Sequence, residues 1–462
     1  MILRSLPLIL SAAIAMAAPI VDIAPESESF LRVPIFNRNP IAISTVHAMD
    51  EARWAPLSNI NAADFAAQVE AGYFATPAIN ELTSYTLVCA LGTPKQDVEL
   101  IFDSGSANLW VKPTYYKPSL STSHKKLNET FLIEYGSANT SGTYHNDVLS
   151  LESVTISQDF GIADHVVGVS ERTQGIIGVG PDILTKITSK KRTVPTPMDN
   201  LLSAGEIKKN VFGVYFERMK DGGHSIRNGE VIFGGYDTSR YSGDIIWADA
   251  PTEYPEKAYW GLNFDKITFG DTEISADPIN GISDTGTSLI LLSPAFFKVL
   301  IDAIPSAVIH KGMISFPNTS LKRLKDMTFV VKGKELTITP EQYTLKPLET
   351  RMMGGNATKT YIWVGENAAV PTLGVILGQK FLEHYYSIYD GENSRVGFAP
   401  VKARTSERPT VDTPKAPVTP LPTPIPTPEP EKPTEPAPCD RTKICCRIFG
   451  NLNPMCCQLL GC

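Results

Sequence analysis

The stretch VELIFDSGSANLWV, residues 98–111, shares one pattern with a second stretch, NGISDTGTSLILL, residues 280–292. In each stretch a hydrophobic run ends in an aspartate, which is followed by a hydroxyl residue, a glycine and another hydroxyl residue. A carboxylate at the end of an apolar strand is costly to bury unless it is hydrogen-bonded or shares a proton with another titrating group. The repeat therefore predicts that Asp103 and Asp284 form one shared site and hold one proton between them.

This doubled motif resembles the signature of the pepsin-like aspartic proteases. The similarity runs from about Phe74 to Pro400 and looks most like the secreted fungal, polyporopepsin-type branch. Further segments agree with the resemblance, namely a flap-like segment at 133–142, an inter-lobe strand at 231–235, and hydrophobic-hydrophobic-glycine elements at 175–178 and 374–378.

The resemblance implies a mainly β, bilobal fold with the active-site cleft between two β-rich lobes. The lobes are expected at about residues 74–240 and 241–400 of a peptidase domain spanning 74–400. Short apolar and alternating segments between turn-rich stretches independently indicate antiparallel sheets, and LSPAFFKVLIDAI is the clearest helical exception.

The resemblance also implies a reaction carried by Asp103 and Asp284. The ionised aspartate acts as general base on a water, while the protonated aspartate donates to the scissile carbonyl, so no covalent intermediate, metal or cofactor is needed. Hydroxyls expected to bond across the lobe interface belong to Ser104 and Thr285. Those expected to bond the outer carboxylate oxygens belong to Ser106 and Thr287. The tight turns are expected to need the glycines Gly105 and Gly286.

The flap-like segment suggests how substrate is bound. Tyr135 resembles the flap tyrosine that closes over substrate, with Trp110 as its hydrogen-bond neighbour through the indole N–H. Gly136 and Ser137 follow it. Because Ser137 stands in place of an aspartate, no flap carboxylate can pair with a lysine, and we expect poor cleavage after lysine. The resemblance implies an extended peptide with hydrophobic residues on both sides of the cut bond.

Three single residues also carry expectations. Ser104 replaces the commoner threonine but keeps the hydroxyl, and Gln379 stands where many relatives carry an acid, so neither departure should abolish activity. The lone Cys89 of the catalytic region falls in an apolar strand and is expected to be a buried thiol.

The N-terminal region predicts two segments ahead of the peptidase domain. Residues 1–17 carry one positive charge ahead of a short apolar stretch and indicate a secretory signal peptide, with a membrane anchor as the alternative. Residues 18–73 are interpreted as a propeptide, with a mere spacer as the alternative. A propeptide would fill the cleft of a zymogen and place a cation near the aspartates, for which the candidates are Arg32, Arg38 and Arg53.

The C-terminal region predicts a linker and a small module. Residues 401–438 are rich in proline and threonine and should form an extended polyproline II linker. Residues 439–462 are dense in cysteine and contain no histidine, which favours disulfides over a metal site in a secreted chain. Attachment or binding to a cell wall, a surface or a partner is the expected role. The candidate disulfide residues are Cys439, Cys445, Cys446, Cys456, Cys457 and Cys462.

The charge balance excludes one class of partner, nucleic acid. The chain has 42 basic and 49 acidic residues and a net charge of −7, which offers no footprint for nucleic acid. We expect protein or peptide substrates, a monomer without an integral membrane segment in the mature chain, and a location outside the cell or at its surface, with vacuolar delivery as the alternative. Sugar at Asn139 would crowd the cleft entrance. Glycosylation acceptor patterns stand at Asn128, Asn139, Asn318 and Asn356.

Two other function classes fit the sequence less well. A catalytically inactive pepsin-like peptide-binding protein would normally lose an aspartate or its hydroxyl partner, and all of these are kept. A glycosidase with paired carboxylates would need a different spacing and sugar-stacking aromatic residues.

Overall fold

The computed structural model describes part of the chain, in unequal segments. The signal-peptide, linker and cysteine-rich predictions lie outside these residues, as does most of the propeptide prediction. The described residues are 31–37, 47, 50, 85–135, 138–167, 173–189, 193–218, 229–275, 279–310 and 312–402.

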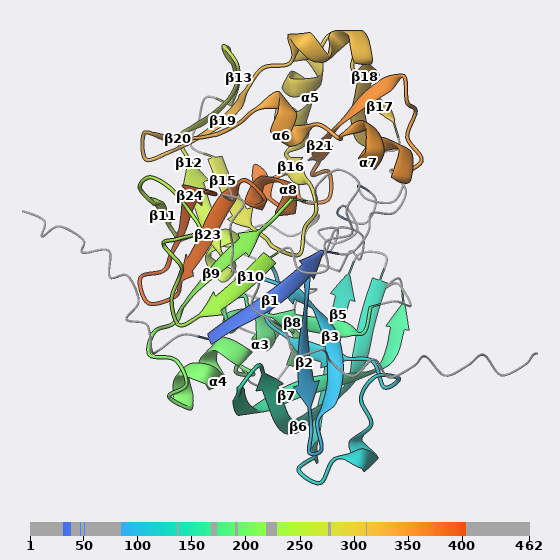
Figure 1. Ribbon diagram of the computed structural model, residues 1–462, viewed down its shortest axis with the longest axis vertical. Helices are drawn as coiled ribbons and strands as arrows, with labels where there is room; N and C mark the ends of the chain where they lie inside the picture. Colours follow the sequence, from blue (N-terminus) through green and yellow to red (C-terminus); the bar gives the residue numbers. More distant parts are fainter. Residues whose placement is uncertain are drawn as a thin grey trace, which may run out of the picture. The chain divides into compact units, whose positions relative to one another are not determined.

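Within this part of the chain the fold is mainly β, as the sequence predicts, and its strands form three sheets of thirteen, seven and four strands (Figure 1). The elements up to residue 240 are β1 (Leu31–Asn37), β2 (Tyr85–Leu91), β3 (Gln96–Asp103), β4 (Leu109–Val111), the 3-10 helix η2 (Pro118–Leu120), β5 (Lys125–Tyr135), β6 (Ala138–Leu151), β7 (Val154–Val167), β8 (Gly175–Gly178), α3 (Ile183–Ser189), α4 (Pro197–Ser203), β9 (Val211–Phe216) and β10 (Gly229–Phe233).

The elements after residue 240 complete the described fold. They are β11 (Ile246–Asp249), η3 (Glu256–Ala258), β12 (Gly261–Phe264), β13 (Lys266–Phe269), β14 (Thr272–Ser275), β15 (Ile279–Ser283), β16 (Ile290–Leu292), α5 (Pro294–Ala303), β17 (Val308–His310), β18 (Met313–Pro317), η4 (Asn318–Arg323), β19 (Met327–Val331), β20 (Lys334–Ile338), α6 (Pro340–Tyr343), α7 (Pro347–Met352), β21 (Lys359–Glu366), β22 (Val375–Leu377), α8 (Gln379–Leu382), β23 (Tyr385–Asp390) and β24 (Arg395–Pro400).

The sequence repeat is also a structural repeat. In the first half, β8 pairs in parallel with the aspartate-bearing strand β3 and antiparallel with β4. In the second half, β22 pairs in parallel with β15 and antiparallel with β16. The glycine that ends each hydrophobic-hydrophobic-glycine element permits this crossing. A Cβ at Gly178 would lie 2.6 Å from the backbone of Ala107, and one at Gly378 would overlap the carbonyl oxygen of Leu289.

The last two described strands, β23 and β24, belong to the same sheet as the strands of the first half. Strand β23 pairs with β9 and β24, and β24 also pairs with β11, so the thirteen-stranded sheet contains strands from both sides of residue 240. Backbone hydrogen bonds between β9 and β23 therefore join the two halves of the chain, while the aspartate-bearing strands β3 and β15 lie in different sheets.

Burial follows the apolar pattern of the sequence. Helix α5 begins with a proline in its first turn, buries Phe297 and Leu300, and leaves the Lys298–Asp302 ion pair exposed, as expected for an amphipathic surface helix. Cys89 is buried on β2, and burial raises the pKa of its thiol, which confirms the expected buried cysteine.

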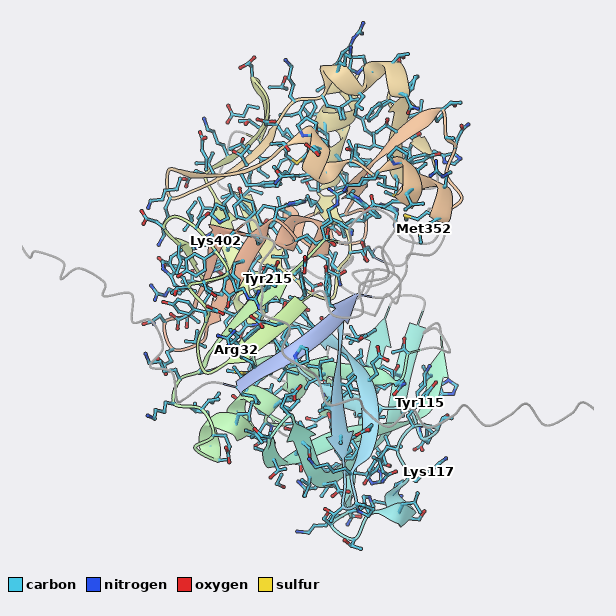
Figure 2. The ribbon with its side chains drawn as sticks, in the orientation of Figure 1. Arg32, Tyr115, Lys117, Tyr215, Met352 and Lys402 are labelled. Atoms are coloured by element: carbon cyan, nitrogen blue, oxygen red, sulfur yellow. The ribbon has the colours of Figure 1, made fainter. Side chains whose placement is uncertain are left out.

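Strand β1 comes from the predicted propeptide and lies between β10 and β2 in the large sheet. Its side chains Val33 and Ile35 are buried. Arg32 projects from the same strand (Figure 2). Its guanidinium forms ion pairs with Glu230 at 3.1 Å and Asp237 at 2.7 Å. The expectation that Arg32 places its cation near the aspartates is therefore wrong, because its guanidinium is bound by these other carboxylates. The other two candidate arginines lie outside the described residues.

No helix in the described part of the chain is long and apolar enough to cross a membrane.

Candidate active site

The first aspartate loop turns sharply at the end of β3. Asp103 is fully buried. Its Oδ1 accepts a hydrogen bond from the backbone N–H of Gly105 at 3.0 Å, and its Oδ2 accepts one from the hydroxyl of Ser106 at 2.5 Å. Both carboxylate oxygens are thus bound by groups from the next three residues, which compensates for the burial of the acid.

The second loop repeats this arrangement directly after β15. Asp284 is also fully buried. Its Oδ1 accepts from the backbone N–H of Gly286 at 2.8 Å, and its Oδ2 accepts from the hydroxyl of Thr287 at 2.5 Å. In both loops a glycine N–H two positions after the aspartate binds Oδ1, and a hydroxyl three positions after it binds Oδ2.

Reciprocal hydrogen bonds join the two loops. The N–H of Ser104 donates to the hydroxyl of Thr285 at 2.8 Å, and the N–H of Thr285 donates to the hydroxyl of Ser104 at 2.9 Å. Each hydroxyl then donates to a carbonyl of the opposite half, Thr285 to Phe102 at 3.1 Å and Ser104 to Ser283 at 3.3 Å. The structure thus joins the two loops that carry the predicted aspartates through hydrogen bonds between the residues next to each aspartate.

Removing the hydroxyl of Thr285 should destabilise this junction. In Thr285→Ala the buried N–H of Ser104 loses its acceptor, so we expect the free energy of unfolding to fall by about 1–3 kcal/mol. Thr285→Ser is the matched control, since it keeps the hydroxyl and loses only a methyl group, at a cost of about 1 kcal/mol. Urea titration of both variants would measure the difference. Equal loss in both would show that the hydroxyl contributes nothing.

Comparisons with known proteins agree with this geometry. The family described as eukaryotic aspartyl protease matches residues 84–401. The chain belongs to this family. It is 33% identical over 339 residues to polyporopepsin from Irpex lacteus, a match that covers 71% of this chain and 98% of polyporopepsin. It is 31% identical over 342 residues to cathepsin E from Cavia porcellus, covering 70% of this chain and 83% of that protein.

A solved structure shows the same fold. The crystal structure of the aspartic proteinase from Irpex lacteus matches with a TM-score of 0.64 and 32% sequence identity, covering 69% of this chain and 94% of that chain. The chain is therefore an aspartic endopeptidase by family, and the family implies peptide substrates. The resemblance drawn from the two aspartate motifs is thereby confirmed.

The predicted flap segment falls on the hairpin of β5 and β6. The backbone of Tyr135 pairs with that of Ala138 at its end. The side chain of Tyr135 lies outside the described part, and so do Gly136 and Ser137. Trp110 is buried on β4, and its indole N–H has no hydrogen-bond partner among the described residues. The tyrosine–tryptophan pair therefore stays a prediction.

Gln379, for which the sequence predicts no role, hydrogen-bonds the second aspartate loop. The side-chain amide of Gln379 donates to the carbonyl of Thr285 at 2.7 Å, and its backbone N–H donates to the carbonyl of Thr287 at 2.8 Å. Gln379 is fully buried. A neutral amide at this position thus binds the second aspartate loop directly.

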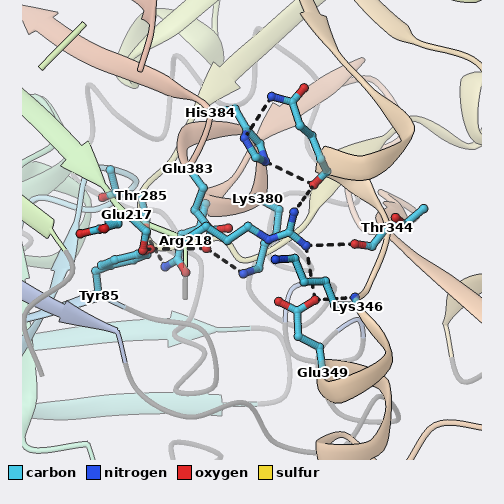
Figure 3. A network of polar contacts seen from close by, with 12 residues as sticks. Tyr85, Glu217, Arg218, Thr285, Thr344, Lys346, Glu349, Lys380, Glu383 and His384 are labelled. Atoms are coloured by element: carbon cyan, nitrogen blue, oxygen red, sulfur yellow. Dashed lines mark hydrogen bonds and ion pairs between the residues drawn. The ribbon is translucent and has the colours of Figure 1, made fainter. Parts of the chain in front are cut away.

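A buried ion pair follows, between Lys380 of α8 and Glu383, the residue directly after that helix. Lys380 donates to Oε1 of Glu383 at 2.7 Å, and the hydroxyl of Tyr85 donates to the same oxygen at 3.4 Å (Figure 3). Burial disfavours the charged carboxylate, but the charges of Lys380 and Arg218 outweigh it and hold the pKa of Glu383 below its usual value. Arg218 in turn pairs with Glu349 at 3.4 Å. The network connects β2 with α8, whose first residue, Gln379, binds the second aspartate loop.

Glu256 is a second buried acid near this loop. It accepts a hydrogen bond from Asn280 on β15, the strand that leads to Asp284. Burial raises the pKa of Glu256 to about 7. The carboxyl group is therefore neutral in acid and gains its charge only as the pH approaches neutrality.

This shift gives a pH-dependent stability. Because the folded pKa lies above the usual 4.5, the contribution of Glu256 is fully present below pH 4.5 and is lost as the pH rises through 7. Glu256→Gln keeps an acceptor for Asn280 without the charge. It should therefore leave stability at acidic pH unchanged and raise the free energy of unfolding at pH values above 7 by about 2–3 kcal/mol. Denaturant titrations of both proteins on either side of this range would test it. A difference that does not depend on pH would contradict the assignment.

The glycosylation candidates differ in their surroundings. Asn128 is exposed on β5, whereas the side chain of Asn139 lies outside the described residues. Asn318 and Asn356 are exposed, but Asn318 donates to the carbonyl of Ala357 and Asn356 accepts from Thr358.

Among the described residues, no three His, Cys, Asp or Glu side chains are grouped so that they could hold a metal ion.

Proposed function

We propose that the protein is a secreted aspartic endopeptidase, made as a zymogen, that hydrolyses peptide bonds between hydrophobic residues at acidic pH. The observation that carries this proposal is the matched hydrogen bonding of two buried carboxylates on loops that bind each other. Two equivalent acids in one buried site favour a state with a single shared proton.

In the proposed reaction a water lies between Asp103 and Asp284. The ionised aspartate takes a proton from the water, and the protonated aspartate donates its proton to the carbonyl oxygen of the scissile bond. The product of attack is a tetrahedral diol, and no bond to the protein forms. Ser106 and Thr287 keep the outer carboxylate oxygens occupied, so that the inner oxygens face the water and the peptide.

The remaining parts of the proposal follow from the sequence. Residues 1–17 would direct secretion, residues 18–73 would be the propeptide, and residues 439–462 would attach the enzyme to a wall, a surface or a partner through a linker at 401–438. The protein would act as a monomer outside the cell or at its surface, with the vacuole as the alternative location.

Cleavage of denatured globin after acid incubation tests the function. We expect hydrolysis at acidic pH that is blocked by a peptide mimic carrying a central hydroxyl, which imitates the diol. A catalytically inactive peptide-binding protein would bind the mimic and leave globin intact, and that result would overturn the proposal.

Substrate choice gives a separate prediction. Because Ser137 provides no carboxylate at the flap, a peptide with lysine before the cut bond should be cleaved with a kcat/KM at least about tenfold below that of the same peptide with leucine. Competition between the two peptides in one reaction, followed by mass spectrometry, measures this ratio directly. Equal rates would show that a lysine is accommodated without a flap carboxylate. If the missing carboxylate is the cause, Ser137→Asp should raise kcat/KM for the lysine peptide and leave that for the leucine peptide unchanged.

A further inference from the structure

Asp50, a residue of the predicted propeptide, lies against the segment that follows the second aspartate loop. Its side chain is fully buried. Oδ1 accepts a hydrogen bond from the backbone N–H of Ser288 at 3.1 Å, and Oδ2 accepts one from the backbone N–H of Leu289 at 2.9 Å. These two N–H groups follow Asp284 within five residues. A propeptide carboxylate is thus bound by the backbone of the loop region that carries one of the catalytic acids.

His47, three positions before Asp50, makes a second contact with the second half of the chain. Both described residues have helical backbone. The Nε2 atom of His47 lies 3.0 Å from the carbonyl oxygen and 3.2 Å from the backbone N of Glu366. Burial lowers the pKa of His47, so the neutral ring is favoured.

The protein provides space for this imidazole. A Cβ atom at Gly312 would overlap Nδ1 and Cβ of His47, and a Cβ atom at Gly365 would overlap its Cδ2. Gly312 also has a φ of 79°, which disfavours any residue with a side chain. The two glycines and the two backbone donors thus form a receptor of defined shape for one histidine and one aspartate.

We propose that Asp50 and His47 anchor the propeptide to the second aspartate half and so hold the zymogen inactive. The inference rests on the proposed function, because it assigns the contact that restrains the same active site. The anchor is a carboxylate received by backbone N–H groups and a ring received between glycines. It differs from the expected arrangement, in which an arginine faces the aspartates.

Asp50→Asn should weaken this anchor with little change in shape. The carboxylate accepts two charge-assisted hydrogen bonds, one on each oxygen. The amide has one acceptor oxygen, so either Ser288 or Leu289 is left with a buried N–H group that lacks an acceptor. Asp302→Asn is the matched control, because it removes a carboxylate from an exposed surface pair with Lys298.

Hydrogen exchange at the Ser288 and Leu289 amides reads the anchor directly. We would measure it in the full-length chain carrying Asp103→Asn, so that self-cleavage cannot remove the propeptide. Asp50→Asn should speed exchange at these amides by about tenfold or more, and Asp302→Asn should not change it. Should Asp50→Asn prevent folding, His47→Ala gives the second test, with faster exchange expected at the amide of Glu366 and at Ser288 and Leu289. Unchanged exchange in the folded variants would overturn the anchor.

Activity separates this inference from the proposed function. With Asp103 intact, Asp50→Asn should shorten the lag before the full-length chain cleaves denatured globin, relative to Asp302→Asn. Faster exchange without globin cleavage by any variant would support the anchor and count against the protease function. Globin cleavage with an unchanged lag and unchanged exchange would support the protease and overturn the anchor alone.

Discussion

Replacing Asp284 with asparagine is expected to lower kcat for peptide hydrolysis by about 10²–10⁴-fold or more, with KM changed little. An amide can neither take a proton from the water nor donate one to the scissile carbonyl. The hydrogen bonds that Asp284 accepts from Gly286 and Thr287 show that the side chain is already fixed in place, so an isosteric amide keeps the geometry while removing the chemistry.

Asp103→Asn should give a loss of the same order, because the two loops have equivalent roles. Asp302→Asn, on the exposed face of α5, serves as the control for loss of one negative charge. Circular dichroism of each variant would show that folding is retained. An enzyme that keeps most of its kcat after either active-site substitution would contradict a reaction that needs both carboxyl groups.

Replacing Lys380 with methionine is expected to cost about 3–5 kcal/mol of unfolding free energy at neutral pH. The side chains of Lys380 and Glu383 are 8% and 2% exposed. Without the ammonium group, Glu383 must keep an uncompensated charge in the interior or take up a proton. Arg218 also favours the charged carboxylate but forms its own ion pair with Glu349.

The pH dependence of this cost follows from the lowered pKa of Glu383. A depressed carboxyl pKa contributes stability that is present above about pH 4.5 and is lost as the pH falls through the folded value. The penalty in Lys380→Met should therefore shrink in acid, where Glu383 becomes protonated and its charge disappears.

A second lysine in the same half provides the control. Lys298 pairs with Asp302 on the surface of α5, where the two side chains are 74% and 64% exposed. Lys298→Met should change the free energy of unfolding by less than about 1 kcal/mol, because exposed pairs contribute little. Similar costs for both lysines at neutral pH would show that the buried pair has no special role.

The two aspartate loops were predictable because their determinants are local. The hydroxyl and glycine residues that bind each carboxylate lie within three positions of it, so the motif itself contains the contacts. The elements that end at Gly178 and Gly378 were found by resemblance, but the strand crossing at these glycines is seen only in the structure. Helix α5 followed from its apolar spacing.

Contacts between distant residues were not predictable from the sequence. The partners of Arg32 are separated from it by 198 and 205 positions, and no local pattern distinguishes them from other acids. The same applies to the carboxylate of Asp50, which binds backbone groups 238 and 239 positions away. Backbone donors leave no trace in side-chain identity, so the sequence of the predicted propeptide points to its arginines and does not single out Asp50.

The sequence also did not predict that β23 and β24 belong to the thirteen-stranded sheet. These strands read as ordinary apolar strands of the second half, and strand pairing depends on which edge is exposed after the rest has folded. A division at residue 240 therefore separates the two motifs correctly but cuts through one sheet.

The central claim is that the two aspartates act as one site with a shared proton, and the pH dependence of kcat/KM tests it most directly. We would measure it for a peptide with hydrophobic residues on both sides of the cut bond, from about pH 2 to about pH 8. The account predicts a bell-shaped profile with its maximum in acid, because the pair is active only after losing its first proton and before losing its second. Activity that rises with a single ionisation to a plateau at neutral pH would contradict it.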